Sequence, residues 1–105
     1  MVRGDVFRFK IPKGIGREQQ GDRYGVVVQA NELLPRSVVL VAPTSRSAAP
    51  ASFRPEIELG STTTRVLIEH LSAVDLSRLG KLSGHVTRDE MSDIDLALAT
   101  VLGLR

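Results

Sequence analysis

Short apolar runs separated by glycine, proline and serine make up most of the first 86 residues of the chain. Runs of β-branched residues and alternating apolar positions predict strands over residues 5–10, 24–29, 38–44, 53–59 and 65–71, with a short sixth strand over 81–86. In the first strand, the alternation predicts Phe7, Phe9 and Ile11 on the buried side and Val6 on the opposite side. Pro55 suggests that the fourth strand lies at an edge of the sheet, because proline cannot donate a backbone hydrogen bond.

Polar segments rich in glycine, proline or serine predict the connections. They cover residues 12–22, 31–36, 45–52, 60–64 and 75–78. The first connection is long, and loops of that length are usually functional or disordered. Its segment Pro12-Lys13-Gly14-Ile15-Gly16 lacks the third glycine of a dinucleotide-binding fingerprint and the Gly-Lys-Ser/Thr ending of a triphosphate-binding loop. No nucleotide cofactor is therefore expected.

The apolar period changes near the C-terminus. Thr87 and Glu90 form a capping box, and the apolar residues that follow recur at helical spacing up to Gly103. These residues are Met91, Ile94, Ala97, Leu98, Val101 and Leu102. Five or six short strands followed by one helix, without alternating strand and helix units, predict a mainly β (α+β) domain over residues 1–105: a small β-barrel with a helical lid.

Composition excludes several classes of function. The chain has 105 residues, no cysteine and two histidines, so neither a disulfide framework nor a metal site is expected. No apolar run approaches the roughly 20 residues of a membrane span, so we expect a cytoplasmic protein without a membrane partner. A core of this size is close to the lower limit for independent stability, which favours self-association.

Basic charge gathers in the N-terminal quarter. Residues 1–25 contain six basic and three acidic side chains, although the net charge of the whole chain is only +2. This excess favours a polyanionic ligand, but a solvated surface has a similar composition.

Two polar residues stand at the ends of apolar runs. Arg23 directly precedes the second predicted strand, and Thr44 ends the third. If these strands are neighbours, both side chains lie on one rim, where a guanidinium and a hydroxyl suit a phosphate group. The alternative is structural: a salt bridge for Arg23 and a strand-end cap for Thr44.

Four segments together resemble the MazF/PemK/Kid family of toxin endoribonucleases. They are Arg3-Gly4-Asp5-Val6, Gly16-x-Glu18-Gln19-x-Gly21-x-Arg23 with the valines that follow, Val41-x-Pro43-Thr44-Ser45, and the closing stretch 79–102. The resemblance implies an SH3-like barrel, a homodimer, and metal-independent cleavage of single-stranded RNA at short sequences. It also implies a cognate antitoxin whose flexible acidic tail lies in the RNA groove.

The resemblance also implies roles for individual residues. Arg23 and Thr44 fall on the principal catalytic groups of the family, and Glu18 falls on the acidic residue of the preceding loop. Cleavage would proceed by attack of the RNA 2'-hydroxyl on the adjacent phosphorus, giving a 2',3'-cyclic phosphate. Glu18 is the first candidate for the base and His70 the second, while a solvated carboxylate and a hydrogen-bonded strand histidine are the structural alternatives. His85 is expected to be structural.

Candidate RNA-binding residues surround this centre. Lys13 and Arg17 are expected to contact phosphates, and Gln19 and Gln20 to contact bases. Tyr24, Ser45 and His70 complete the predicted set.

The chain departs from the family pattern at two places. Tyr24 stands where the family usually has proline, and Glu69-His70 stands on the expected fifth strand where the family often has Asp-Gln. The second departure points to a changed base preference.

Two other functions remain open from the sequence. One is a CcdB-like toxin of the same barrel superfamily that binds DNA gyrase, against which Arg23 and Thr44 argue. The other is a non-catalytic RNA-binding module. The sequence does not give the recognised bases.

Overall fold

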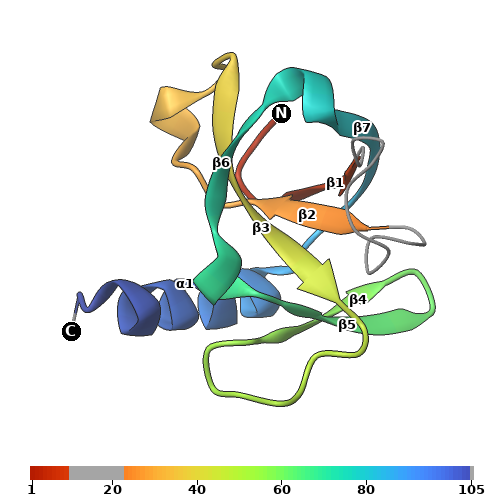
Figure 1. The fold of residues 1–105 in the computed structure, drawn as a ribbon, viewed down its shortest axis with the longest axis vertical. Helices are drawn as coiled ribbons and strands as arrows, with labels where there is room; N and C mark the ends of the chain where they lie inside the picture. Colours follow the sequence, from red (N-terminus) through yellow and green to blue (C-terminus); the bar gives the residue numbers. More distant parts are fainter. Residues whose placement is uncertain (10–22, 105) are drawn as a thin grey trace, which may run out of the picture.

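The computed structural model describes residues 1–9 and 23–104 (Figure 1). Its strands are β1 (Asp5–Phe9), β2 (Tyr24–Val27), β3 (Val38–Ser45), β4 (Glu56–Leu59), β5 (Thr62–Val66), β6 (Ser72–Asp75) and β7 (Leu79–His85). Three short 3-10 helices, η2 (Asn31–Leu33), η3 (Ile68–His70) and η4 (Leu76–Arg78), and the helix α1 (Arg88–Leu102) complete the elements. No helix in these two ranges is long and apolar enough to cross a membrane.

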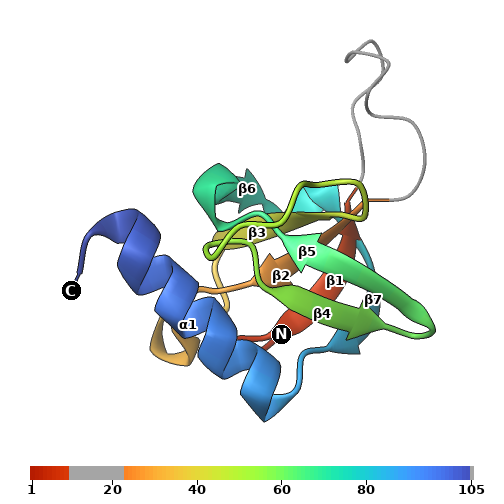
Figure 2. The same ribbon diagram turned by 90° about the horizontal axis from the view of Figure 1, so that it is seen from below.

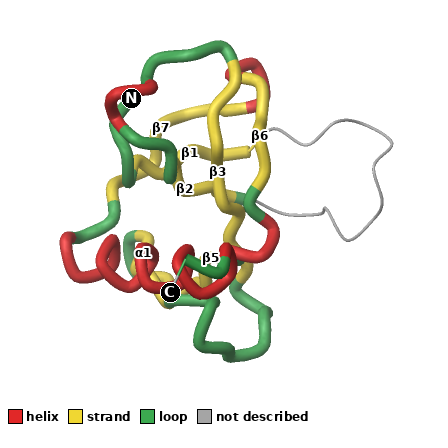
Figure 3. The backbone as a smooth tube through the Cα atoms, turned by 90° about the vertical axis from the view of Figure 1, so that its left-hand side faces the viewer, coloured by secondary structure: helices red, strands yellow, loops and turns green. Residues whose placement is uncertain are grey.

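The strands form one antiparallel sheet that curls into a half-barrel. Its order is β4-β5-β3-β2-β1-β7, and β6 pairs with β3 beside this path. The long strand β3 pairs with β2 along one side, and along its other side with β6 through residues 38–41 and with β5 through residues 44–45. Figure 3 shows the strands with α1 running across one side of them. The predicted fold class, mainly β with a C-terminal helix, is confirmed.

Two apolar clusters fill the two faces of the sheet. The cluster on the helix side comprises Val6, Val26, Val28, Ala42, Ile57, Val66, Ile68, Val86, Ile94 and Ala97. The cluster on the other face comprises Val27, Val39, Val41, Val74 and Leu79, with Phe7, Phe9 and Leu34 packed against it. A helix of this length is marginal alone, so burial of Ile94 and Ala97 against the sheet is what holds α1 in place (Figure 2).

The predicted helix boundaries are confirmed. The Thr87 hydroxyl accepts from the Glu90 N–H at 3.1 Å, and the Glu90 carboxylate accepts from the Thr87 N–H at 2.8 Å. Gly103 ends the helix with a φ of 68°, a conformation that favours glycine. The same Glu90 side chain also accepts from the Glu58 N–H at 2.8 Å, and so joins the start of α1 to β4.

The prediction of five or six strands was wrong at the fifth position. Residues 62–66 form β5, not a turn, and residues 68–70 form η3, so Glu69 and His70 do not lie on a strand. Residues 72–75 form β6, which the sequence did not predict. Its pattern is weak because Val74 is the one buried residue of the four.

The predicted burial of the first strand was half right. Phe7 and Phe9 do pack into one cluster, but Val6 is fully buried in the other. A strand covered on both faces does not alternate between apolar and polar residues. Ile11 lies outside the described residues. The prediction for Pro55 is confirmed in that it directly precedes β4, the strand at one end of the sheet path.

Candidate functional site

The structure brings Arg23 and Thr44 to one edge of the sheet. Gly25 pairs with Pro43, so the register continued by one and two residues brings Tyr24 opposite Thr44 and Arg23 opposite Ser45. On the other side of β2, the Phe9 N–H donates to the Arg23 carbonyl at 2.8 Å. The half-buried Arg23 therefore lies just before β2, between β1 and β3, and opposite Ser45 rather than Thr44.

Thr44 is more buried than its predicted role suggests. Only 3% of the residue is exposed, and its hydroxyl donates to the Tyr24 carbonyl at 3.1 Å. This is the strand-end cap that we considered as the structural alternative. The bond fixes the backbone immediately after Arg23. To donate to a phosphate, the hydroxyl would first have to turn away from Tyr24.

Sequence reasoning missed Gly25, which shapes this edge. A Cβ atom at Gly25 would lie 2.5 Å from Val41 Cγ1 and 2.6 Å from Phe9 Cε2. Only glycine lets the three strands approach so closely beside Arg23. An isolated glycine between Tyr24 and the valine run was the available signal.

The other predicted RNA-binding residues of the described part occupy different surroundings. The Ser45 hydroxyl, opposite Arg23, lies 3.3 Å from the Ser47 hydroxyl. The Tyr24 ring is half-buried and packs against the helix-side cluster. His70 lies on η3, and its side chain is 60% exposed.

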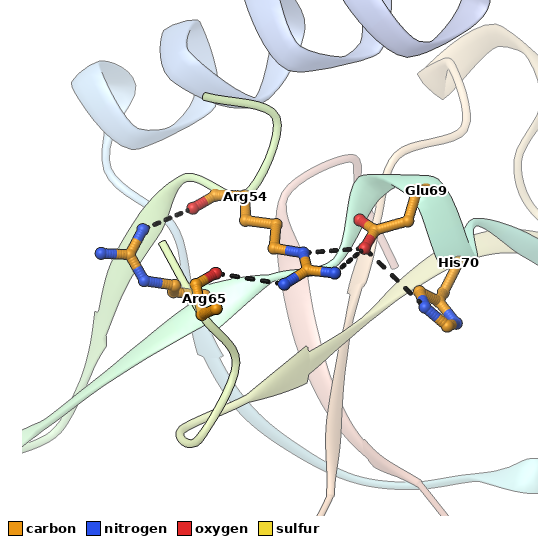
Figure 4. A network of polar contacts seen from close by, with 5 residues as sticks. Arg54, Arg65, Glu69 and His70 are labelled. Carbon is orange, nitrogen blue, oxygen red and sulfur yellow. Dashed lines mark hydrogen bonds and ion pairs between the residues drawn. The ribbon is translucent and has the colours of Figure 1, made fainter. Parts of the chain in front are cut away.

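An ion-pair network links η3 to the segment that follows Ser45 (Figure 4). The Arg54 Nε donates to Glu69 Oε2 at 2.7 Å, and Arg54 Nη1 donates to the Ala49 carbonyl at 3.1 Å. His70 Nε2 lies 3.8 Å from the same Oε2 atom. Glu69 Oε1 is buried without a hydrogen-bond partner among the described residues. The Glu69 carboxylate thus holds the 46–54 segment through Arg54, and it also faces His70.

The electrostatics of Glu69 follow from this arrangement. Burial by itself would raise the pKa of Glu69, but the hydrogen bond from Arg54, assisted by the positive charges of Arg54 and His70, lowers the pKa below its ordinary value. The group is therefore ionised at neutral pH.

A second arginine fixes the backbone of Arg54. Arg65 Nη1 donates to the Arg54 carbonyl at 2.9 Å, and Arg65 Nη2 lies 3.0 Å from Glu56 Oε2 (Figure 4). Because Arg65 pairs with Ser45 across β5 and β3, the network is anchored next to the candidate site. The sequence offered no signal for either arginine, since their partners are distant along the chain.

The remaining predicted residues divide into two groups. Glu18, Lys13, Arg17, Gln19 and Gln20 lie outside the described residues. His85 lies at the opposite end of the sheet, where its Nδ1 is 2.9 Å from Asp5 Oδ1. Within residues 1–9 and 23–104, no three His, Asp or Glu side chains are grouped as a metal site would require.

Comparisons with known proteins agree with this fold. Residues 2–102 match the family described as PemK-like, MazF-like toxin of type II toxin-antitoxin system. The chain is 40% identical, over 99% of both chains, to the Mycobacterium tuberculosis protein named "Putative toxin Rv3098A/RVBD_3098A".

Solved structures share the fold at lower identity. An endoribonuclease in complex with its cognate antitoxin, from a mycobacterial species, superposes with a TM-score of 0.82 at 22% identity, over 100% of this chain and 97% of that chain. A chain of the MazE-MazF (Form-II) structure from Deinococcus radiodurans superposes with a TM-score of 0.77 at 18% identity, over 98% of this chain and 95% of that chain. The predicted family is confirmed: the chain belongs to the PemK-like, MazF-like toxins of type II toxin-antitoxin systems.

Proposed function

We propose that this toxin is an endoribonuclease that cuts single-stranded RNA at short sequences, without a metal ion, and thereby inhibits translation and growth. The observation that carries the proposal is the β2–β3 register, which brings Arg23 to the sheet edge where Thr44 and Ser45 end β3. Family membership supports the same reaction class, since structural relatives are named endoribonucleases.

The proposed reaction needs no nucleophile from the protein. The RNA 2'-oxygen attacks the adjacent phosphorus while its proton passes to a base, and the bond from phosphorus to the 5'-oxygen breaks. The products are a 2',3'-cyclic phosphate and a 5'-hydroxyl, whose oxygen takes its proton from a general acid or from water. In this scheme Arg23 donates hydrogen bonds to the phosphate oxygens, whose negative charge increases in the transition state.

We assign Thr44 first as a positioning residue. Its hydroxyl holds the Tyr24 carbonyl at 3.1 Å, one residue after Arg23, and so orients the backbone that carries the guanidinium. A direct contact with a non-bridging oxygen would require rotation of this hydroxyl. Ser45, which is less buried and opposite Arg23, provides a second hydroxyl at the same edge.

Glu18 remains our first candidate for the base that accepts the 2'-hydroxyl proton. We assign His70 to RNA bases instead, because its exposed ring lies on η3, shortly after the strand that pairs with Thr44. Lys13 and Arg17 would bind phosphates, while Gln19, Gln20 and Tyr24 would contact bases.

The proposed assembly follows the family. Residues 1–105 would act as one toxin domain in a cytoplasmic homodimer. A cognate antitoxin with an acidic flexible tail would occupy the RNA-binding surface and so block cleavage. Structural relatives in complex with antitoxins support this partner.

The test is cleavage of a mixed RNA pool by the pure protein in EDTA, with both new ends mapped. We expect cuts within a short shared sequence and a cyclic phosphate on the upstream fragment. Arg23→Ala should lower the rate about 100-fold or more. Arg88→Ala, which removes one positive charge from an exposed residue beyond the opposite end of β7, is the matched control. Undiminished cleavage by Arg23→Ala would exclude the mechanism.

A further inference from the structure

Four strands end at the edge that carries Arg23. The C-terminal ends of β3 and β1 and the N-terminal ends of β2 and β7 meet there, because each neighbouring pair is antiparallel. One row across this edge runs from Ser45 through Arg23 and Phe9 to Leu79, since Phe9 pairs with Leu79 and binds the Arg23 carbonyl. Arg78 immediately precedes Leu79, and it therefore lies at the same edge, next to the start of β7.

The Arg78 side chain is held at this edge by an aromatic ring. Its Cζ atom lies over the Phe9 ring, 5.9 Å from the ring centre, and the residue is exposed. A guanidinium over a ring face is attracted by the ring quadrupole, yet its N–H donors lie in its own plane and stay available to an acceptor. The contact thus preorganises a donor group that is suited to a phosphate.

Charge on this edge is mainly positive, although Asp75 directly precedes η4 and caps it. Residues 8–9, 23–24 and 76–81 contain four basic side chains, Arg8, Arg23, Arg78 and Lys81, and no acidic one. Arg78 differs in its contacts from three other arginines of the described part. Arg3, Arg54 and Arg65 each form an ion pair with a carboxylate, at 2.6 to 3.0 Å. An edge on which basic side chains predominate fits a polyanion.

We infer that Arg78 binds a backbone phosphate of the RNA and that the RNA path crosses this edge from β3 to β7. The inference rests on the proposed function and extends it. Two strand spacings of about 4.8 Å each, roughly 10 Å, separate β2 from β7. Arg78 therefore contacts a phosphate other than the one that is cut, and it contributes to binding rather than to the chemical step.

The experiment measures binding and cleavage separately. The probe is the RNA oligonucleotide defined by cut-site mapping, with a 2'-deoxy nucleotide at the cut site so that it binds without being cleaved. Arg78→Ala is compared with Arg88→Ala, which makes the same change of charge at the opposite end of the sheet. We expect Arg78→Ala to weaken binding about three- to tenfold more than the control at low salt. It should also reduce the slope of log affinity against log salt by about 0.7.

Further arms identify the contacted phosphate. On cleavable RNA, Arg78→Ala should raise KM and leave kcat within about twofold of the wild type. Removing nucleotides from one end of the probe, but not from the other, should abolish the difference between Arg78→Ala and wild type. Arg78→Lys keeps the charge and should retain the salt slope, and thermal melting of each variant checks the fold.

The outcomes separate this inference from the proposed function. Absence of cleavage by the wild type overturns both. Arg23-dependent cleavage with Arg78→Ala equal to the control in binding and salt slope overturns the inference alone. A loss of antitoxin binding without a loss of RNA binding would also overturn it, because the edge would then be a protein-binding surface.

Discussion

The two ends of the β1–β2–β7 region use the same residue types for opposite purposes. At one end, where β1 begins and β7 finishes, Arg3 and Asp5 are bound to internal partners. At the other end, Arg23 and Arg78 lie near the basic residues Arg8 and Lys81, and Arg78 lies over the Phe9 ring. Both ends attracted attention in the sequence, because an arginine-containing motif stands at each.

Arg3 acts as a junction between elements. Its backbone N–H donates to Asn31 Oδ1 at 2.7 Å, its Nε donates to the Val28 carbonyl at 2.8 Å, and its Nη2 lies 2.8 Å from Asp95 on α1. These contacts join the start of the chain, the end of β2 and the C-terminal helix. Arg3 is thus a structural residue.

Asp5 and Gly4 complete this junction. The Asp5 carboxylate accepts from the Val2 N–H at 2.8 Å and lies 2.9 Å from His85 Nδ1. Gly4 has a φ of +96°, and a Cβ atom there would lie 3.0 Å from the His85 ring. The Arg-Gly-Asp motif is therefore explained by packing and hydrogen bonding.

The difference between the two ends teaches that an arginine in a family motif does not by itself indicate a ligand. Arg3 pairs with a carboxylate, whereas Arg78 lies over an aromatic ring. An arginine that already pairs with a carboxylate has much of its donor capacity in use, whereas one held by an aromatic ring keeps its donors available.

After Arg23→Ala, the largest effect is expected from Thr44→Val at the same end. This change keeps the shape of the side chain but removes the donor to the Tyr24 carbonyl, so the backbone beside Arg23 loses its support. We expect kcat to fall about 10- to 100-fold, with a smaller change in RNA affinity. Thr44→Ser, which keeps the hydroxyl, should recover most of the activity. Equal losses of kcat and affinity would show that Thr44 serves RNA binding.

A change at the opposite end should affect stability instead. Arg3→Ala removes the bonds to Val28 and Asp95 and leaves the Val28 carbonyl without this donor. We expect the free energy of unfolding, measured in urea, to fall by about 2 kcal/mol. The cleavage rate per folded molecule should stay within about twofold of the wild type. A tenfold loss of kcat in a folded Arg3→Ala protein would contradict the proposal that this end is structural and the other end functional.

The smallest effect is expected away from both ends of this region, at the Arg54–Glu69 pair beside β3. The folded-state pKa of Glu69 lies below its ordinary value of 4.5, so the stabilisation is complete above that value and is lost as the pH falls through the folded pKa. Glu69→Gln should therefore lower stability by about 1 kcal/mol at pH 7, and the difference from wild type should shrink in acid. The charged groups that face Glu69 are Arg54 and His70.

Urea unfolding of both proteins from pH 7 down to pH 3 measures this difference. Glu56→Gln is a suitable control, because it removes a more exposed carboxylate from the neighbouring Arg65 pair. A difference that stays constant with pH would mean that Glu69 contributes through packing rather than through its charge.

Strong local signals decided how well the fold could be predicted. The capping box and the apolar period fixed α1, and the valine runs fixed β2 and β3. Errors fell where the local signal was weak or ambiguous. The sequence predicts a turn over residues 60–64, but residues 62–64 are three threonines, and β-branched residues favour strands. β6 was missed because it depends on its pairing with β3, and that pairing lies outside its own sequence.

The candidate site divides in the same way. The sequence determined that Arg23 precedes one buried strand and that Thr44 ends another, because each position follows from apolar runs close by in the chain. Only the tertiary structure decided that Gly25 lets three strands converge there, that Arg54 binds Glu69, and that Arg78 lies over Phe9. These three contacts join residues 15 to 69 positions apart in the chain. The physical reason is that a local pattern records how a segment buries its own side chains, whereas the partner of a charged side chain is set by strand pairing and packing over the whole chain.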